Sequence, residues 1–258
     1  MDGSLAAIRA ERGLVAVLVA VTALAWWWTD VQMRGMDAGP WTSLGPFGWF
    51  LGIWVVMMAA MMVPSAIPTV ALYSHLSQGR SLLRSLLFAA GYLAVWIAGG
   101  IAAFATAGLA GRVAGGSLGW TEAGRWVAGA TILTAAVYQL TPLKDACLRR
   151  CRNPVALLLG SWRPGAAGAF RMGSTSGLWC TGCCWALMVS LFALGAMSIR
   201  WMALVAAIVA LEKTLPRRRL GSRAIAGLLL AIGVLLLAAP DALPALTIPG
   251  SQPMRMGG

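Results

Sequence analysis

Three of the five cysteines lie within five positions, in the stretch WCTGCCWALM at residues 179–188. In a helix of about 3.6 residues per turn, Cys180, Cys183 and Cys184 share one face, and Met188 continues that face. A single thiol in a helix usually behaves as a small buried hydrophobic group. Three thiols and one thioether on a single stripe favour a binding site for a soft metal ion.

A second sulfur-rich stretch is WVVMMAAMMVP at residues 54–64. Met57 and Met61 are four residues apart, as are Met58 and Met62, so the thioethers stack on adjacent rows of a helix. Pro64 follows, and a proline inside a helix removes a backbone hydrogen bond and favours a kink. Two interpretations remain open: the methionines fill an irregular core, or they supply thioether ligands to a metal.

The remaining cysteines lie in YQLTPLKDACLRRCRNP, residues 138–154. Cys147 and Cys151 are four residues apart on a predicted short amphipathic helix, with arginines between and after them. Nearby positive charge lowers a thiol pKa and favours the thiolate, which is the form that binds metal. We interpret this pair as a docking or relay pair for metal.

The types of ligand narrow the choice of metal. Thiolates and thioethers suit Cu(I), whereas zinc, nickel and iron sites usually also recruit imidazole or carboxylate. The chain has one histidine, His75, which excludes a site with several histidines. The sequence therefore predicts Cu(I) as the bound metal.

The elements that must position these sulfurs are membrane helices. Of the 258 residues, 59% are hydrophobic and 11% are charged, and the mean hydropathy is +0.78. So few charges exclude an ordinary water-soluble domain, in which about 25% of residues are charged. The composition predicts an all-α polytopic membrane bundle. In such a protein the net charge of +12 reflects the lysines and arginines of the loops, which set the orientation in the membrane, and does not indicate nucleic-acid binding.

Seven apolar segments are long enough to be predicted transmembrane helices. They are residues 13–29, 47–73, 82–110, 122–141, 173–197, 199–213 and 222–240. We expect residues 1–240 to form a single transmembrane domain and 241–258, rich in Pro and Gly, to be a disordered extracytoplasmic tail. An alternative for the first segment is a cleaved signal peptide, but the Trp26–Trp28 run is typical of an interfacial anchor.

Positive charges assign the orientation of the segments. Fifteen of the 20 lysines and arginines fall before the first segment, in alternate loops or at the segment ends beside those loops, and five fall on the other side. The positive-inside rule therefore predicts a cytoplasmic N-terminus. With that topology, Met57–Met62 and Cys180–Cys184 lie at a similar depth, toward the cytoplasm. We therefore predict a copper site between the second and fifth segments, which requires those two helices to be neighbours.

The stretches WVVMMAAMMVPS, YQLTPLKDACLRRCRNP and GLWCTGCCWALM, followed by LEK at 211–213, resemble the DUF2182 family of predicted metal-binding integral membrane proteins, some of which are described as copper chaperones. The resemblance implies a multi-pass protein of the bacterial inner membrane with a soft-metal site. Matched by position, it points to Met57, Met58, Met61, Met62, Pro64, Tyr138, Pro142, Lys144, Cys147, Cys151, Gly177, Cys180, Cys183, Cys184, Trp185, Met188, Glu212 and Lys213.

Three functions remain open on sequence alone. The first is Cu(I) binding for copper transport, or for delivery to a membrane or periplasmic cuproprotein, with a soluble copper carrier as a further partner. The chain lacks a Walker motif, so ATP-driven pumping by this chain is not expected. For this first function we expect a metal-binding, transport or chaperone role rather than an enzymatic one. The second is a membrane thiol–disulfide oxidoreductase, because C-x-x-C spacing permits that chemistry. The third is a structural membrane subunit without enzymatic activity, whose cysteines only pack.

Overall fold

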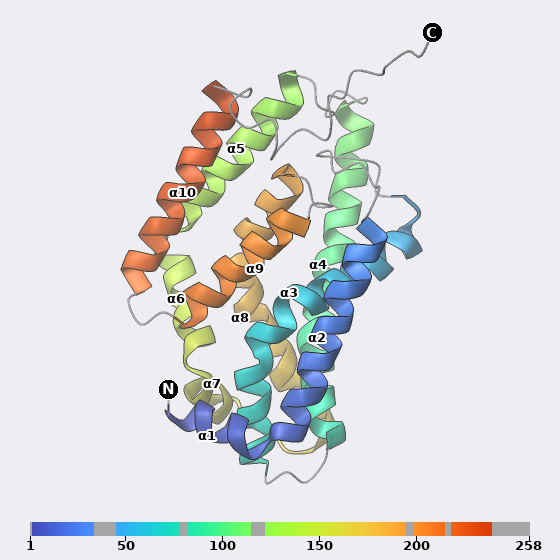
Figure 1. The fold of residues 1–258 in the computed structure, drawn as a ribbon, viewed down its shortest axis with the longest axis vertical. Helices are drawn as coiled ribbons and strands as arrows, with labels where there is room; N and C mark the ends of the chain where they lie inside the picture. The colour runs from blue at the N-terminus through green and yellow to red at the C-terminus, as the bar shows by residue number, and fades with distance from the viewer. Residues whose placement is uncertain are drawn as a thin grey trace.

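A computed structural model describes residues 2–33, 45–77, 82–114, 122–194, 199–214 and 218–238. Within these ranges the regular structure is entirely helical (Figure 1). The helices are α1 (Asp2–Ala10), α2 (Arg12–Met33), α3 (Phe47–Leu76), α4 (Leu82–Ala114), α5 (Glu122–Tyr138), α6 (Pro142–Arg152), α7 (Pro154–Gly160), α8 (Gly165–Leu194), α9 (Ile199–Thr214) and α10 (Arg218–Ala238). The expected tail, residues 241–258, lies outside the described residues.

The seven predicted segments correspond to α2, α3, α4, α5, α8, α9 and α10. The main difference is at α8, which begins at Gly165 rather than at residue 173. Gly165 has a φ of 83°, a left-handed conformation that suits glycine, and so turns the chain after Pro164 into the helix. The alanines and glycines that follow carry little hydrophobic signal, which is why the apolar pattern missed these first turns.

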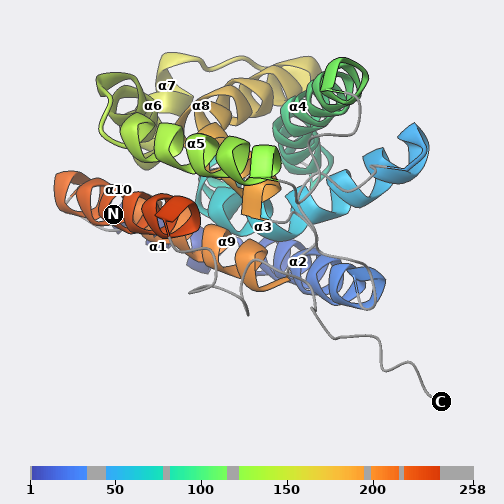
Figure 2. The ribbon, with the colours of Figure 1, turned by 90° about the horizontal axis from the view of Figure 1, so that it is seen from above.

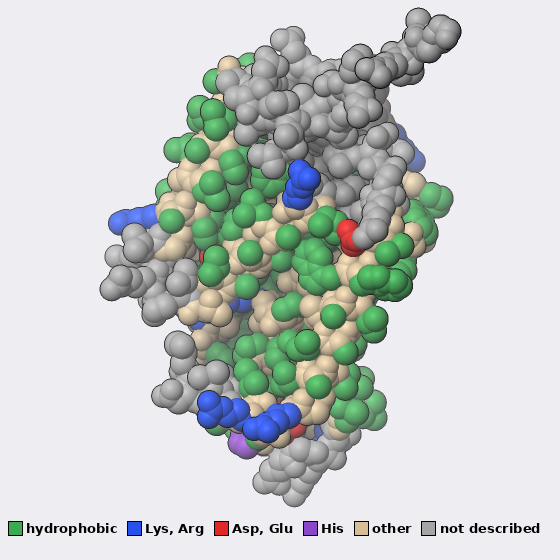
Figure 3. All heavy atoms as spheres, in the orientation of Figure 1, with side chains coloured by type: hydrophobic (Ala, Val, Ile, Leu, Met, Phe, Trp, Pro, Cys, Tyr) green, Lys and Arg blue, Asp and Glu red, His purple; other side chains and the backbone are tan. Residues whose placement is uncertain are grey.

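Four of the described helices, α2, α3, α4 and α10, are long and apolar enough to cross a membrane. The helices α5 and α6 would make a fifth span if they were counted together, although they are bent by 66° at the break between them. Large hydrophobic side chains are exposed along α2 and α10, and hydrophobic side chains cover much of the visible face in Figure 3. The structure thus supports an all-helical fold with four or five membrane-length segments.

Helix α3 lies inside the bundle. Viewed from above, α10, α9 and α2 lie along one side, α8 and α4 lie along the other, and α3 is between them (Figure 2). Most of the central part of α3 is buried, including the whole methionine run. The most extensive packing of α3 is with α2 and α4, whereas α8 packs mainly on α4, α6 and α5.

Glycines allow α4 and α8 to approach closely. A Cβ atom added at Gly91 would collide with the backbone of Phe170, and one added at Gly173 would collide with the backbone of Phe88. One turn further along α8, a Cβ at Gly177 would lie 2.9 Å from the carbonyl oxygen of Tyr92. Small residues at such crossings let helix backbones touch in a membrane protein. This close approach brings Tyr92 to the cysteine stripe.

Helix α6 begins with a local signal that the sequence carries. Thr141 is its N-cap, with a side chain that accepts a hydrogen bond from the Lys144 amide at 3.3 Å, and Pro142 occupies the first turn. Both residue types are favoured at those positions. The amphipathic helix predicted around Cys147 and Cys151 is confirmed.

Candidate metal site

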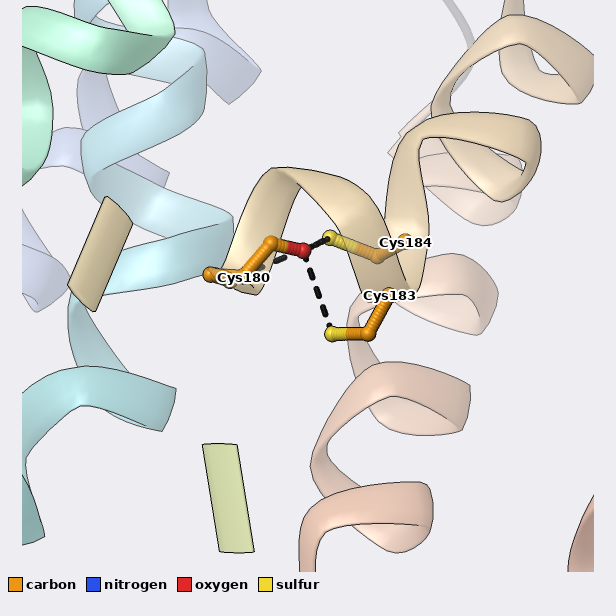
Figure 4. Close-up of side chains that lie close together, drawn as sticks. All are labelled: Cys180, Cys183 and Cys184. Carbon is orange, nitrogen blue, oxygen red and sulfur yellow. Dashed lines mark hydrogen bonds between the residues drawn. The ribbon is translucent and has the colours of Figure 1, made fainter. Parts of the chain in front are cut away.

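The three clustered cysteines form a compact group of thiols. The Sγ atoms of Cys180, Cys183 and Cys184 all lie within 4.8 Å of one another, and each residue is at most 2% exposed. The thiols of Cys183 and Cys184 both donate to the carbonyl oxygen of Cys180, at 3.1 and 2.8 Å (Figure 4). The helical offsets of three and four residues therefore place the sulfurs together, as their spacing predicts.

A fourth sulfur comes from α6. The Sγ atoms of Cys151 and Cys183 are 3.7 Å apart, although the residues are 32 positions apart in the chain. All five cysteines are free thiols. The sequence assigned Cys151 to a separate relay pair, whereas the structure puts its thiol at the edge of the main cluster. Cys151 thus extends the group to four sulfurs from two helices.

Cys147 packs against the same segment without joining the group of four. Its Sγ atom is 2.8 Å from where a Cβ at Gly182 would lie, so the absence of a side chain there admits the thiol. Burial raises the pKa of the Cys147 thiol, and the nearby Cys183 adds to the increase. The arginines of α6 were expected to lower thiol pKa values. For Cys147 that expectation is wrong, because burial and the neighbouring Cys183 raise the pKa of its thiol instead.

Cys180 is also contacted by two polar groups from other helices. The Tyr92 hydroxyl on α4 donates to Cys180 Sγ at 2.9 Å, and the Lys213 ammonium on α9 donates to the same atom at 3.1 Å. Lys213 also donates to the Ser65 hydroxyl on α3 at 2.7 Å. Among the described residues, Lys213 forms no ion pair with a carboxylate within 4.0 Å. A cationic donor therefore faces a thiol sulfur rather than an acid.

The methionine run lies on α3, the helix that Ser65 and Lys213 connect to Cys180. All four of Met57, Met58, Met61 and Met62 are buried, as is Met188 on α8. Ser65 donates to the carbonyl oxygen of Met62 at 2.8 Å and accepts from Lys213, so one chain of contacts joins α3 to Cys180. The prediction required α3 and α8 to be neighbours, but they do not pack extensively on each other. They meet through α4 and α9, and Lys213 lies between them.

Polar contacts join the helices that surround the cysteine cluster. Lys144 on α6 pairs with both carboxylate oxygens of Glu212 on α9, at 2.7 and 2.8 Å, and also donates to the amide oxygen of Gln139. The Tyr138 hydroxyl donates to the Gly182 carbonyl oxygen at 2.5 Å, and its ring meets Trp185 edge-on with centroids 4.9 Å apart. These contacts connect the α5–α6 corner to both α8 and α9.

Comparison with known protein families gave a match over most of the chain. The family model described as "PpoB2: Copper chaperone" matches residues 51–236, which is well over half of the chain. The chain belongs to the PpoB2 copper chaperone family. The match covers both sulfur-rich stretches, residues 54–64 and 179–188, and both cysteines of α6. Neither the curated proteins nor the solved structures gave a match.

For this member of the PpoB2 family, sequence reasoning found the sulfurs but missed two of their polar neighbours. Tyr92 and Ser65 lie in apolar segments without any pattern that marks them, and only helix packing brings them to Cys180 and Lys213. Lys213 and Glu212 were indicated by the family resemblance, and Glu212 also by its place at the end of the sixth predicted segment. A charged LEK sequence ending an apolar helix could have been a signal, because ionisable residues in such segments are costly and usually functional.

Proposed function

We propose that this protein binds Cu(I) in the membrane and acts in copper transport or in delivery of copper to a membrane or periplasmic cuproprotein. The observation that carries the proposal is the group of three buried thiols with Sγ atoms within 4.8 Å of one another. Thiolate sulfur is the ligand type that Cu(I) prefers. Membership in a copper chaperone family supports the same metal.

Binding would replace thiol protons by the metal. Cys183 and Cys184 now donate to a backbone carbonyl, and loss of their protons frees the sulfurs to bind the ion. Two or three thiolates around Cu(I) carry a net negative charge, which is costly in an apolar interior. The Lys213 ammonium, 3.1 Å from Cys180 Sγ, is placed to offset that charge.

Exchange between neighbouring sulfurs would let the ion move. Cys151, 3.7 Å from Cys183, offers a thiol on the side of α6, and Met188 continues the stripe along α8. The thioethers of Met57, Met58, Met61 and Met62 are buried on α3, the helix that Ser65 and Lys213 connect to Cys180. In this proposal Cu(I) passes between sites in which two or three sulfurs bind it. Cys147, whose thiol lies beside Gly182, is a further ligand that could bind the ion during this exchange.

We further propose the membrane arrangement in which this would happen. The seven helices that match the predicted segments would span a bacterial inner membrane, with the N-terminus in the cytoplasm and residues 1–240 forming one domain. The exposed hydrophobic side chains of α2 and α10 support contact with lipid. A soluble copper carrier and a receiving cuproprotein are the partners that such a role would need.

Metal analysis of the detergent-purified protein tests the proposal. Wild-type protein should bind Cu(I) in competition with a chromophoric chelator, and the triple variant Cys180→Ser, Cys183→Ser and Cys184→Ser should lose that binding. Ser190→Ala is a matched control, because Ser190 is buried on α8 and donates only within its own helix, to Ala186. Full Cu(I) binding by the triple variant would show that the cluster is not the site.

A membrane thiol–disulfide oxidoreductase is the second candidate, and one contact favours it. Cys151 and Cys183 lie on different helices, and their Sγ atoms are 3.7 Å apart. Two thiols at this distance can form a disulfide by thiol–disulfide exchange after only a small movement. A redox titration with thiol alkylation would detect a reversible disulfide between these residues. If alkylation shows no such bond across the potentials of cellular thiols, this candidate is eliminated.

A further inference from the structure

A buried ion pair lies at the corner of α5, α6 and α9. The side chains of Lys144 and Glu212 are 1% and 3% exposed, and the Lys144 ammonium reaches both carboxylate oxygens. Gln139 accepts from the same ammonium, and its own amide nitrogen is buried without a hydrogen-bond partner. The free energy lost when two charges leave water offsets much of the attraction between them, so a buried ion pair is weak evidence for a role in stability. A role in setting geometry explains it better.

The pair fixes the helix that supplies the fourth sulfur. Lys144 and Cys151 are seven residues apart, which is about two turns, so both lie on one face of α6. Cys147 and Leu148, both buried, lie between them on that face. Because the face is continuous, the rotation of α6 that sets Lys144 against Glu212 also sets Cys151 against Cys183.

The same end of α9 contacts the cluster directly. Glu212 holds α6, and the next residue, Lys213, donates to Cys180 on α8. Two adjacent side chains of α9 therefore connect to the two helices that carry the sulfurs. These polar contacts thus connect both α6 and α8 to the same end of α9, in addition to the direct packing of α6 on α8.

We propose that Lys144 and Glu212 are positioning residues that hold Cys151 beside Cys183, making Cys151 a ligand of the same Cu(I) ion rather than part of a separate relay. The assignment of Cys151 as a ligand rests on the proposed copper function. The positioning role does not, because it concerns the distance between two thiols whether or not metal is bound.

The test of positioning uses no metal. In a background with Cys147→Ser, Cys180→Ser and Cys184→Ser, only Cys151 and Cys183 remain. Diamide should oxidise these two thiols to a disulfide, itself being reduced to the hydrazine, and alkylation of the remaining thiols followed by mass spectrometry gives the rate. Adding Lys144→Met and Glu212→Gln together should slow disulfide formation at least about tenfold. The double change leaves no unpaired buried charge, which favours retention of the fold.

Controls separate positioning from general disturbance. Arg149→Gln breaks the exposed pair with Asp145 on the same helix and should leave the rate unchanged. Helical content and gel-filtration elution should match between the background and the double variant. An unchanged rate in the folded double variant, an equal loss in Arg149→Gln, or no disulfide in the background would overturn the positioning role.

A copper measurement then tests the ligand assignment. With the native cysteines, the Lys144→Met, Glu212→Gln variant should weaken Cu(I) binding to the level of Cys151→Ser, and X-ray absorption should show fewer sulfurs per copper in both. If wild-type protein binds no Cu(I), the proposed function fails. The rates of disulfide formation still show whether Lys144 and Glu212 hold Cys151 beside Cys183. If Cys151→Ser binds Cu(I) with unchanged affinity and sulfur number, Cys151 is not a ligand.

Discussion

The sharpest prediction concerns Gly91, where α4 touches α8. An alanine methyl there would lie less than 3.0 Å from the Phe170 backbone, well inside the 3.4 Å at which ordinary contacts begin. Backbone atoms cannot rotate away, so the two helices must separate. Gly99, two turns along the same helix, is the matched control, because a Cβ there meets nothing within 4 Å.

The magnitude follows from two opposing effects. Overpacking a close contact costs about 1–3 kcal/mol, and contact with a backbone favours the upper part of that range. Replacing glycine by alanine inside a helix returns about 1 kcal/mol. We therefore expect Gly91→Ala to be destabilised by about 1–2 kcal/mol. Gly99→Ala, which has no contact to lose, should be stabilised by up to about 1 kcal/mol.

The assay is the midpoint of thermal unfolding in one detergent for both variants and for wild type. The order of midpoints should be Gly99→Ala, wild type, Gly91→Ala. Because Tyr92 follows Gly91 and donates to Cys180, the Gly91 variant should also show weaker Cu(I) binding than the Gly99 variant. A Gly91→Ala protein as stable as Gly99→Ala would refute the close packing of α4 on α8 and the placement of Tyr92 that depends on it.

Three further substitutions have simple expected outcomes. Tyr92→Phe removes the hydroxyl that donates to Cys180 and keeps the ring; it should cost about 0.5–1.5 kcal/mol in thermal unfolding while copper stoichiometry is retained. Thr141→Ala removes the N-cap of α6 and should cost about 0.5–2 kcal/mol, measurable as a lower unfolding midpoint than that of a Thr131→Ala control on α5. Arg149→Gln loses only an ion pair between side chains that are 54% and 36% exposed. Its free energy of unfolding, obtained from the thermal midpoint, should change by less than about 0.5 kcal/mol, and a larger loss would contradict the exposed geometry of the pair.

The sequence alone determined the features that depend on local periodicity. Apolar length and composition predicted helices at all seven segments, and offsets of three and four residues predicted that Cys180, Cys183 and Cys184 share a face. The spacing of Cys147 and Cys151 predicted a short amphipathic helix, which is α6. Such inferences succeed because helical geometry repeats every few residues and needs no knowledge of neighbouring helices.

The tertiary structure decided which helices bring partners to that face. The expected direct meeting of α3 and α8 is replaced by contact through Lys213 and Ser65, and Cys151 joins the cysteines instead of forming a separate pair. Tyr92 reaches Cys180 because glycines let α4 lie close to α8. Rotation, depth and choice of neighbour depend on which small residues allow two backbones to touch and on which buried charges must pair. Those choices join residues far apart in the chain, so no local pattern carries them.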